Sequence, residues 1–244
     1  PPFKVSLVPT EYAGHAQEIA NKITKNNQPH IILSSSGDGG YNEVINGVLE
    51  HKNHDHIVTG IIPSGNANDH YNELSTNMAL ADRIKKQAFF TIDTLHLSTN
   101  TLSRYAHSYI GFGVTPHIGE KLTKATLNPI NEVWIVVKNI FTVRPVKIVQ
   151  NGKVQRYDNL LFSNIGTMSK VIKLTENASL TDGKFEIVSN KSRSIGTLVK
   201  HLFRASTVGL NSKRRASRAS FKLVRKASVQ LDGEVIQLPG GSRV

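Results

Sequence analysis

Two strand-to-turn junctions of the same kind constrain this chain more than any other feature. The apolar run Ile31–Leu33 leads directly into the turn Ser34–Gly40, and a helical pattern begins at Asn42. The next apolar run, Ile57–Ile62, leads into a second small-residue turn, Pro63–Asp69. Ligands of α/β proteins bind at the carboxyl ends of parallel strands. Two neighbouring strand ends of this composition, each with an aspartate, predict one shared cleft.

The composition of the first turn points to phosphate. Glycines let the backbone approach an anion closely, and free N–H groups at a helix start point at it. The turn matches neither the G-x-x-x-x-G-K-[ST] loop nor a full G-x-G-x-x-G, so a plain strand-to-helix corner remains open. Asp38 would repel a phosphate unless a cation lies between them or the carboxylate acts as a base. The alternative interpretation of Asp38 is that it is the N-cap of the following helix. We interpret the turn as a nucleotide site of a phosphotransferase.

The first part of the chain alternates between strands and helices. Apolar spacing predicts strands at Phe3–Val8, His30–Leu33 and Ile57–Ile62, and helices at Gly14–Lys25, Asn42–Glu50 and Met78–Lys86. This rhythm is typical of a parallel sheet with helices on its faces. We expect an α/β domain over residues 1–90.

The second part reads as mostly antiparallel β, and we expect it to form a domain over residues 91–244. Asn151-Gly152 between two alternating runs suits a type I′ hairpin turn. Two helices are expected near Gly119–Ala125 and Ile195–Ala205. The predicted strands are Thr91–Ser98, Tyr105–Gly113, Val146–Gln150, Lys153–Tyr157, Asn159–Ile165, Lys184–Ser189, Ser220–Arg225 and Ser228–Asp232.

Charge and composition narrow the function classes. The net charge is +12, and the window Lys191–Lys226 holds eleven basic residues and no acid. Such a window attracts phosphate-rich partners, although a solvated surface is the plain alternative. The chain has no cysteine, which excludes disulfides and cysteine nucleophiles and suits a reducing cytoplasm. No apolar run reaches eighteen residues, so no membrane span is expected. The scattered histidines His15, His70 and His117 lack metal-ligand spacing, so we expect no zinc role.

Five short motifs in order complete the picture. Ser36–Gly47 resembles GGDGT-x-NEV-x-NG, and Gly60–Asp69 resembles G-x-x-P-x-GT-x-ND. Thr10–Ala16 resembles T-E-x-x-GHA, Leu180–Gly183 resembles L-x-DG, and Asp232–Glu234 matches DGE. Together these motifs resemble the diacylglycerol kinase catalytic domain family, in its bacterial soluble lipid kinase branch. That branch is related to sphingosine kinases and NAD kinases.

The resemblance implies a fold and a set of site residues. The fold would be a Rossmann-like nucleotide domain, lacking its first strand and loop here, followed by a β-sandwich lipid domain. Asp232 and Glu234 would both lie in the cleft, and Glu234, or alternatively Asp232, would be the base on a lipid hydroxyl. Asp38 and Asp69 would bind catalytic Mg²⁺, whereas Asp182, with carbonyls of Ser179 and Lys184, would hold a structural Mg²⁺. ATP would contact Thr10, Ser36, Gly37, Asp38, Gly39, Gly40, Tyr41, Asn42 and Asn66.

Departures from the motifs leave alternatives open. Gly40 and Asn66 stand where the family has threonines, and the family's asparagine-proline phosphate loop is expected upstream of Pro1. The expected reaction is ATP-dependent phosphorylation of diacylglycerol. A sphingoid-base kinase and a non-catalytic nucleotide- or lipid-binding relative remain alternatives. NAD kinases share the glycine turn, but the GHA and NEV-x-NG elements favour the lipid branch.

The partners follow from the expected substrate. A lipid kinase without a membrane span must meet the bilayer from the cytoplasm, so the basic window predicts peripheral binding to the anionic inner membrane surface. Part of Ile195–Ala205 is amphipathic and could contact lipid or pack on the β domain. No recognition helix or aromatic RNA-binding motif supports nucleic-acid binding. Homodimerisation is left open.

Overall fold

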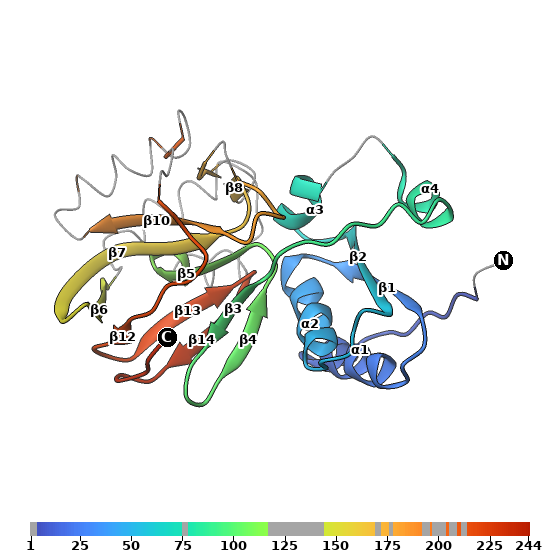
Figure 1. The fold of residues 1–244 in the computed structure, drawn as a ribbon, viewed down its shortest axis with the longest axis horizontal. Coiled ribbons are helices and arrows are strands. Elements are labelled where there is room, and N and C mark those ends of the chain that lie inside the picture. Colours follow the sequence, from blue (N-terminus) through green and yellow to red (C-terminus); the bar gives the residue numbers. More distant parts are fainter. Residues whose placement is uncertain are drawn as a thin grey trace.

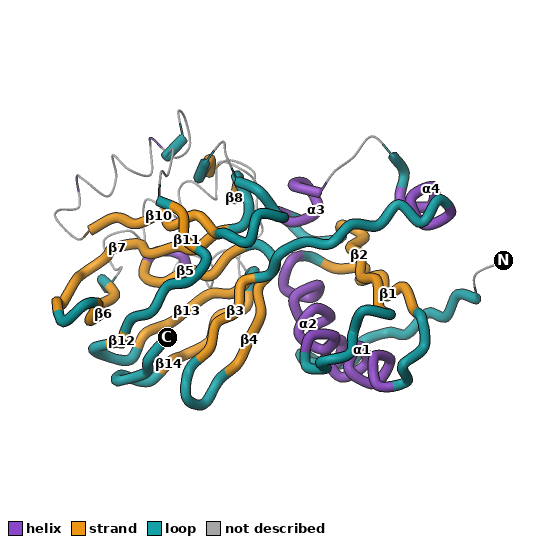
Figure 2. The backbone as a smooth tube through the Cα atoms, in the orientation of Figure 1, coloured by secondary structure: helices purple, strands orange, loops and turns teal. Residues whose placement is uncertain are grey.

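The chain forms two lobes, one of helices around two parallel strands and one of antiparallel strands (Figure 1). The computed structural model describes residues 4–74, 78–116, 144–168, 172–175, 178–191, 196, 204, 209–210 and 214–244. Figure 2 shows the labelled helices gathered in one lobe together with β1 and β2, and the other labelled strands in the second lobe.

The N-terminal lobe follows the predicted alternation. Its elements are α1 (His15–Lys25), β1 (His30–Ser36), α2 (Asp38–Leu49), β2 (Ile57–Pro63), α3 (Asp69–Leu74) and α4 (Leu80–Lys85). β1 and β2 pair in parallel, with Ser36 opposite Pro63, so both strands end at the same level. A Cβ added at Gly47 of α2 would lie 2.2 Å from the Gln17 carbonyl oxygen of α1. Glycine there lets the two helices pack backbone against backbone.

Two local predictions for this lobe were wrong. Residues 4–8 form no strand, and Val5 and Leu7 are 87% and 95% exposed because no described strand lies beside them. α2 begins at Asp38 rather than at Asn42. Three residues of the glycine segment therefore form the first helical turn, since two glycines there do not prevent helical dihedral angles when the following residues are firmly packed.

The C-terminal lobe is built on one eight-stranded antiparallel sheet. Its main order is β11-β10-β7-β5-β13-β14, and β6 joins β7 to β12. Separate hairpins are β3–β4 and β8–β9. The bounds are β3 (Leu95–Ser98), β4 (Ser103–Ala106), β5 (Tyr109–Gly113), β6 (Val146–Gln150), β7 (Lys153–Ser163), β8 (Thr167–Met168), β9 (Ile172–Lys173), β10 (Phe185–Lys191), β11 (Arg215–Ala216), β12 (Lys222–Leu223), β13 (Ala227–Leu231) and β14 (Glu234–Leu238).

Aromatic packing closes the core of this lobe. Phe112 and Phe162 meet edge to face at 6.5 Å between centroids, and Phe162 stacks on Phe221 at 6.0 Å. Asn151 and Gly152 have φ of 51° and 72°, which confirms the predicted type I′ hairpin. β14 was not predicted. The helices expected near 119–125 and 195–205 lie almost entirely outside the described residues.

Within the described part of the chain, no helix combines the length and apolar character needed to cross a bilayer.

Candidate active site

The two glycine-rich turns touch each other, as their matched composition predicted. The Ser64 amide donates to the Ser36 carbonyl at 3.0 Å, and the hydroxyl oxygens of Ser35 and Ser64 are also 3.0 Å apart. A Cβ added at Gly65 would lie 2.4 Å from the Cα of Gly37. Only glycine permits this approach, so the two strand ends form one continuous edge.

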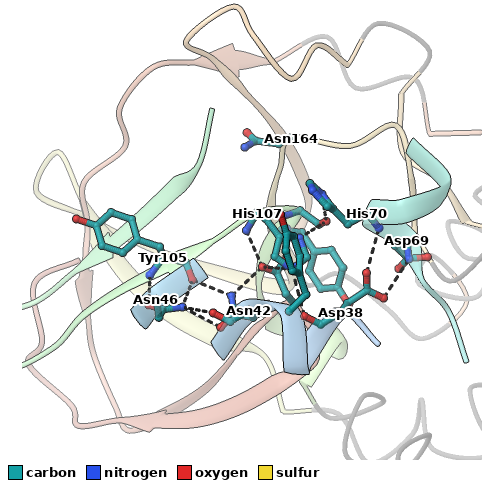
Figure 3. Close-up of polar contacts among 12 residues, drawn as sticks. Asp38, Asn42, Asn46, Asp69, His70, Tyr105, His107 and Asn164 are labelled. Atoms are coloured by element: carbon teal, nitrogen blue, oxygen red, sulfur yellow. Dashed lines mark hydrogen bonds and ion pairs between the residues drawn. The ribbon is translucent and has the colours of Figure 1, made fainter. Parts of the chain in front are cut away.

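Asp38 joins this edge to helix α3 (Figure 3). Its two carboxylate oxygens accept the backbone N–H groups of Asp69 and His70, each at 3.0 Å. These are the first residues of α3, whose free N–H groups carry partial positive charge. Asp38 therefore caps a neighbouring helix rather than its own, and it fixes Asp69 beside the glycine turn.

Asp232 lies at the tight turn between β13 and β14 and is fully buried. One carboxylate oxygen accepts the Ser108 and Tyr109 amides at 3.0 and 2.8 Å. The other accepts the His107 amide at 2.6 Å and the Asn42 side-chain amide at 2.9 Å. Charge-assisted hydrogen bonds of this kind are strong. A carboxylate with four donors and no exposed surface anchors the fold, which corrects the expectation that Asp232 sits open to substrate in the cleft.

Helix α2 is attached to the β lobe by two asparagines. The side-chain amides of Asn42 and Asn46 donate to the Tyr105 carbonyl at 2.8 and 3.0 Å, and Asn46 accepts the Tyr105 amide at 2.9 Å. Figure 3 shows both asparagines turned toward the backbone of Tyr105 in β4. The helix that starts in the glycine turn is thus bound to the opposite lobe.

These contacts engage the side chains of two expected ATP residues, so an ATP contact there stays a prediction for the backbone alone. Tyr41 and Asn42 are only 3% and 1% exposed, because both lie on the buried face of α2. The Tyr41 hydroxyl bonds to the Thr59 hydroxyl at 2.8 Å. Their side chains hold the helix in place and do not face a nucleotide.

Two buried histidines pack beneath the turn, with ring centroids 4.3 Å apart. His107 Nε2 lies 3.2 Å from the Asp38 carbonyl oxygen and 3.3 Å from the Asp232 carboxylate. His70 Nε2 has no hydrogen-bond partner among the described residues. Burial, aided by His107, lowers the pKa of His70 well below 6.5. The sequence did not predict this histidine pair, because His70 and His107 are far apart along the chain and meet only in the folded structure.

The lowered pKa makes stability depend on pH. The unfolded chain takes up a proton at His70 near pH 6.5, whereas the folded chain does not until much lower pH. The free energy of unfolding should therefore fall by up to about 1.4 kcal/mol per pH unit as pH drops below about 6.5. His70→Phe should remove this part of the slope. Urea titrations of both proteins between neutral and mildly acidic pH, without divalent cations, measure it, and parallel profiles would contradict the assignment.

Three carboxylates gather around the buried Tyr109. Its pKa is raised well above 10 by burial first, and then by Asp69, Asp232 and Asp38. Beside them lies a cavity of about 290 Å³, lined among described residues by Asp69, Asn72, Glu73 and Thr167. Carboxylate and carbonyl oxygens suit Mg²⁺, which keeps several waters and needs room for them. The carboxylates of Asp69 and Glu73 at this cavity suit a hydrated magnesium ion, whereas Asp38, whose two oxygens accept α3 amides, is not among the described lining residues.

The expected structural Mg²⁺ site does not fit its residues. Asp182 accepts the Lys184 amide at 3.0 Å through one oxygen, and its other oxygen is paired with the Arg215 guanidinium. Arg215 also contacts Glu186 at 2.7 Å. The Ser179 hydroxyl accepts the Thr181 amide at 3.4 Å. Arginine already supplies the positive charge at this loop.

The remaining predicted residues are Thr10 and Asn66, outside the contacts described above, and Glu234, close to the glycine turn. Thr10 and Asn66 are exposed. The turn after Asp232 packs on the glycine turn, because a Cβ added at Gly233 would lie 3.7 Å from the Gly39 amide nitrogen. Glu234 follows directly as the first residue of β14 and is half-buried. The structure thus brings Glu234 next to the glycine turn from the other lobe.

Comparison with known proteins shows which proteins this chain is similar to. Residues 2–97 match the model of the diacylglycerol kinase catalytic domain. A diacylglycerol kinase of Staphylococcus saprophyticus is 25% identical over 98% of this chain and 81% of its own length. The N-terminal part of the chain thus matches this domain family, and the chain as a whole is similar to bacterial diacylglycerol kinases. A diacylglycerol kinase of Bacillus subtilis is 24% identical over 95% of the chain and 80% of its own length.

Solved structures from Bacillus anthracis share the fold of this chain. A diacylglycerol kinase structure from Bacillus anthracis strain Sterne superposes with a TM-score of 0.65 at 19% identity, over 96% of this chain and 80% of that one. The predicted combination of an α/β domain followed by a mostly β domain is thereby confirmed. The division at residue 90 stays a prediction.

A contact with Ser36 explains why this chain has Gly40 where the diacylglycerol kinase motif has threonine. A Cβ added at Gly40 would lie 2.7 Å from the Ser36 Cβ and 2.8 Å from its hydroxyl oxygen. In the motif GGDGT the first position is glycine and the last is threonine, and this chain has Ser36 and Gly40 instead. The Ser36 hydroxyl therefore occupies the space beside residue 40 that a threonine side chain would need.

Sequence reasoning missed two anchoring carboxylates. Glu43 accepts the amides of Gly14 and Ala16 at 2.9 and 3.2 Å, which ties the start of α1 to α2. Asp93 accepts the Gly183 amide at 2.6 Å and so fixes the Asp182 loop. Glu43 stands in the NEV motif and could have been recognised from it, whereas a lone Asp93 carries no local signal.

Proposed function

We propose that this protein transfers the γ-phosphate of ATP to a lipid hydroxyl, converting diacylglycerol to phosphatidic acid. The observation that carries the proposal is the contact between the Asp232–Gly233 turn and Gly39. It sets Glu234 of the β lobe beside the glycine turn of the α/β lobe. A phosphate-binding turn and a carboxylate from separate lobes are what transfer between two substrates requires.

The nucleotide would bind along the shared edge of the two turns. Backbone N–H groups around Gly37 and Gly39, at the start of α2, would hold its phosphates. The Ser36 hydroxyl would supply the donor that Gly40 cannot. Thr10 and Asn66, both exposed, would flank the nucleotide.

Asp38 and Asp69 would hold magnesium, which neutralises charge on the transferring phosphoryl group when bound. The backbone N–H groups at the start of α3 donate to the Asp38 carboxylate and so hold it in position to bind the metal. Asp69 lines the adjoining cavity. The protein's share of catalysis is then mainly the positioning of these two carboxylates.

Glu234 would take the proton of the lipid hydroxyl. As that proton moves to its carboxylate, the hydroxyl oxygen bonds to the γ-phosphorus and the bond to the bridging oxygen of ADP breaks. General-base removal of this kind contributes about 10²–10⁴ in rate. Asp232, saturated by four donors, is a positioning residue for this turn.

Replacing the base tests the proposal directly. Glu234→Gln should lower kcat by about 10²-fold or more, with the ATP dissociation constant and the unfolding midpoint close to wild type. The assay is transfer of label from γ-labelled ATP to diacylglycerol in detergent micelles with Mg²⁺. Full turnover in this variant would overturn the role of Glu234.

A sphingoid base is the second candidate acceptor. A sphingoid long-chain base kinase of Arabidopsis thaliana is 40% identical over 69 residues, which is 27% of this chain and 9% of that protein. The cavity lining includes the carboxylates of Asp69 and Glu73, which would attract an amine. Offering both lipids with γ-labelled ATP names the acceptor. ATP binding without any labelled lipid would favour a non-catalytic relative.

The proposed acceptor sets the place of action. We propose that the protein works in the cytoplasm, at the anionic inner face of the membrane, where its lipid resides. The charge of +12 supports attraction to such a surface.

A further inference from the structure

One face of the β lobe combines cations with valines. It is formed by β6, the first half of β7, β12 and the C-terminal residues. Side chains alternate across a strand, and Val146 and Ile148 point into the core at 4% and 2% exposure, so Lys147 and Val149 point outward. We call the outward set the basic–valine face. It consists of Lys147, Val149, Val154, Arg156, Lys222, Val224 and Arg243.

The strand register places these residues together. Lys147 pairs with Arg156, and Val149 pairs with both Val154 and Lys222. Lys222 in turn pairs with Arg243 through an isolated bridge. The Val224 amide donates to the Lys147 carbonyl at 2.9 Å, which extends β12 along β6. Four cations therefore surround three valines on one side of the sheet.

The basic–valine face is exposed, and its positive charge is not neutralised by neighbouring described carboxylates. Val154 and Val224 are 65% and 41% exposed, whereas Val146, Val188 and Val229 of the same sheet are buried. Over the described residues, no carboxylate forms an ion pair with any of the four cations. Residues 144–157 and 214–231 contain no acid at all. Asp158, the next carboxylate along β7, is 7% exposed and so does not neutralise the surface.

This composition fits a bilayer better than it fits water or nucleic acid. A solvated face needs no exposed valines, and a nucleic-acid surface usually adds aromatic side chains for base stacking. An anionic bilayer offers phosphates for the cations and an apolar layer for the valines. Each basic residue at such a surface contributes enough attraction to change partitioning by about fivefold.

We infer that the basic–valine face is the surface through which this protein docks on an anionic membrane. The inference rests on the proposed lipid acceptor, and it assigns the contact to β6, β7 and β12. Only part of the basic window at residues 191–226 contributes to it, through Lys222. Lys147, Arg156 and Arg243 lie outside that window and join it only in the folded sheet.

Vesicle sedimentation of the full chain without ATP tests the docking surface. Arg156→Gln with Lys222→Gln should weaken partitioning onto phosphatidylcholine–phosphatidylglycerol vesicles by about 25-fold. The matched control is Lys22→Gln with Lys25→Gln, which removes the same charge from exposed positions of α1. Because salt screens charges beyond about 10 Å, the control should stay within about twofold of wild type. Val154→Ser should weaken the binding that persists in high salt.

The outcomes separate docking from catalysis. Transfer to diacylglycerol in detergent micelles should be unchanged in Arg156→Gln with Lys222→Gln, because neither residue belongs to the proposed site. Vesicle binding that follows the basic–valine face supports the docking surface even if no lipid is phosphorylated. Equal losses in both double variants, no preference for anionic vesicles, or binding to an oligonucleotide instead of vesicles would overturn it.

Discussion

Asp38→Asn should reduce lipid phosphorylation by about 10³-fold while leaving the protein folded. The carboxylate has two duties in the proposed site, capping α3 through the Asp69 and His70 amides and binding magnesium. An amide oxygen can still accept one of the two N–H groups, so the helix start should lose only about 1 kcal/mol. It cannot replace the charge next to the phosphates. Turnover with labelled ATP, and its dependence on Mg²⁺ concentration, measure the effect.

Asp55→Asn is the matched control for this change. The Asp55 side chain is 98% exposed on the same lobe, so the same chemical change there should leave turnover within about twofold of wild type. If Asp38→Asn retains most of its activity, the glycine turn is not where magnesium acts, and the proposed chemistry has to move elsewhere.

Asp232→Ala should be the most destabilising single change in the proposed site. It leaves the amides of His107, Ser108 and Tyr109 without an acceptor where the native side chain has no exposed surface. Each buried unsatisfied donor costs about 1–3 kcal/mol, so we expect a loss of at least about 3 kcal/mol. That is a large share of the stability of a typical domain. Urea unfolding followed by circular dichroism measures it.

Glu234→Ala is the companion variant in the same hairpin. Glu234 is half-buried two residues further on, and its removal should cost less than about 1 kcal/mol. The two variants should therefore behave oppositely, Asp232→Ala losing stability and Glu234→Ala losing turnover. A stable but inactive Asp232→Ala would assign Asp232 to the chemistry instead of the framework.

The predictable part of the fold is the part that local pattern controls. The two turns after β1 and β2, the helix periods and the Asn151-Gly152 hairpin all lie within short stretches of sequence. The start of α2 at Asp38 was missed because glycines disfavour helix locally, and burial of Tyr41 and Asn42 outweighs that preference.

The sequence predicted which residues lie in the candidate site better than it predicted what each of them does there. Short motifs pointed to Asp38, Asp232 and Glu234 together, yet gave no measure of burial. Burial separates them, since Asp232 is enclosed by backbone donors and Glu234 is half-exposed. His107, which touches both Asp38 and Asp232, could not be found because its neighbours come from three distant parts of the chain.

Because residues 36 and 40 lie so close together, the side chain at one position limits what the other position can hold. Threonine at position 40 collides with Ser36, and glycine at both positions leaves this pair of residues without a hydroxyl. A path between GGDGT and the SGDGG of this chain has to pass through one of these two states. We therefore expect relatives to carry one hydroxyl at this pair of positions, on either residue but not on both. Gly40→Thr should need Ser36→Gly as its compensating change.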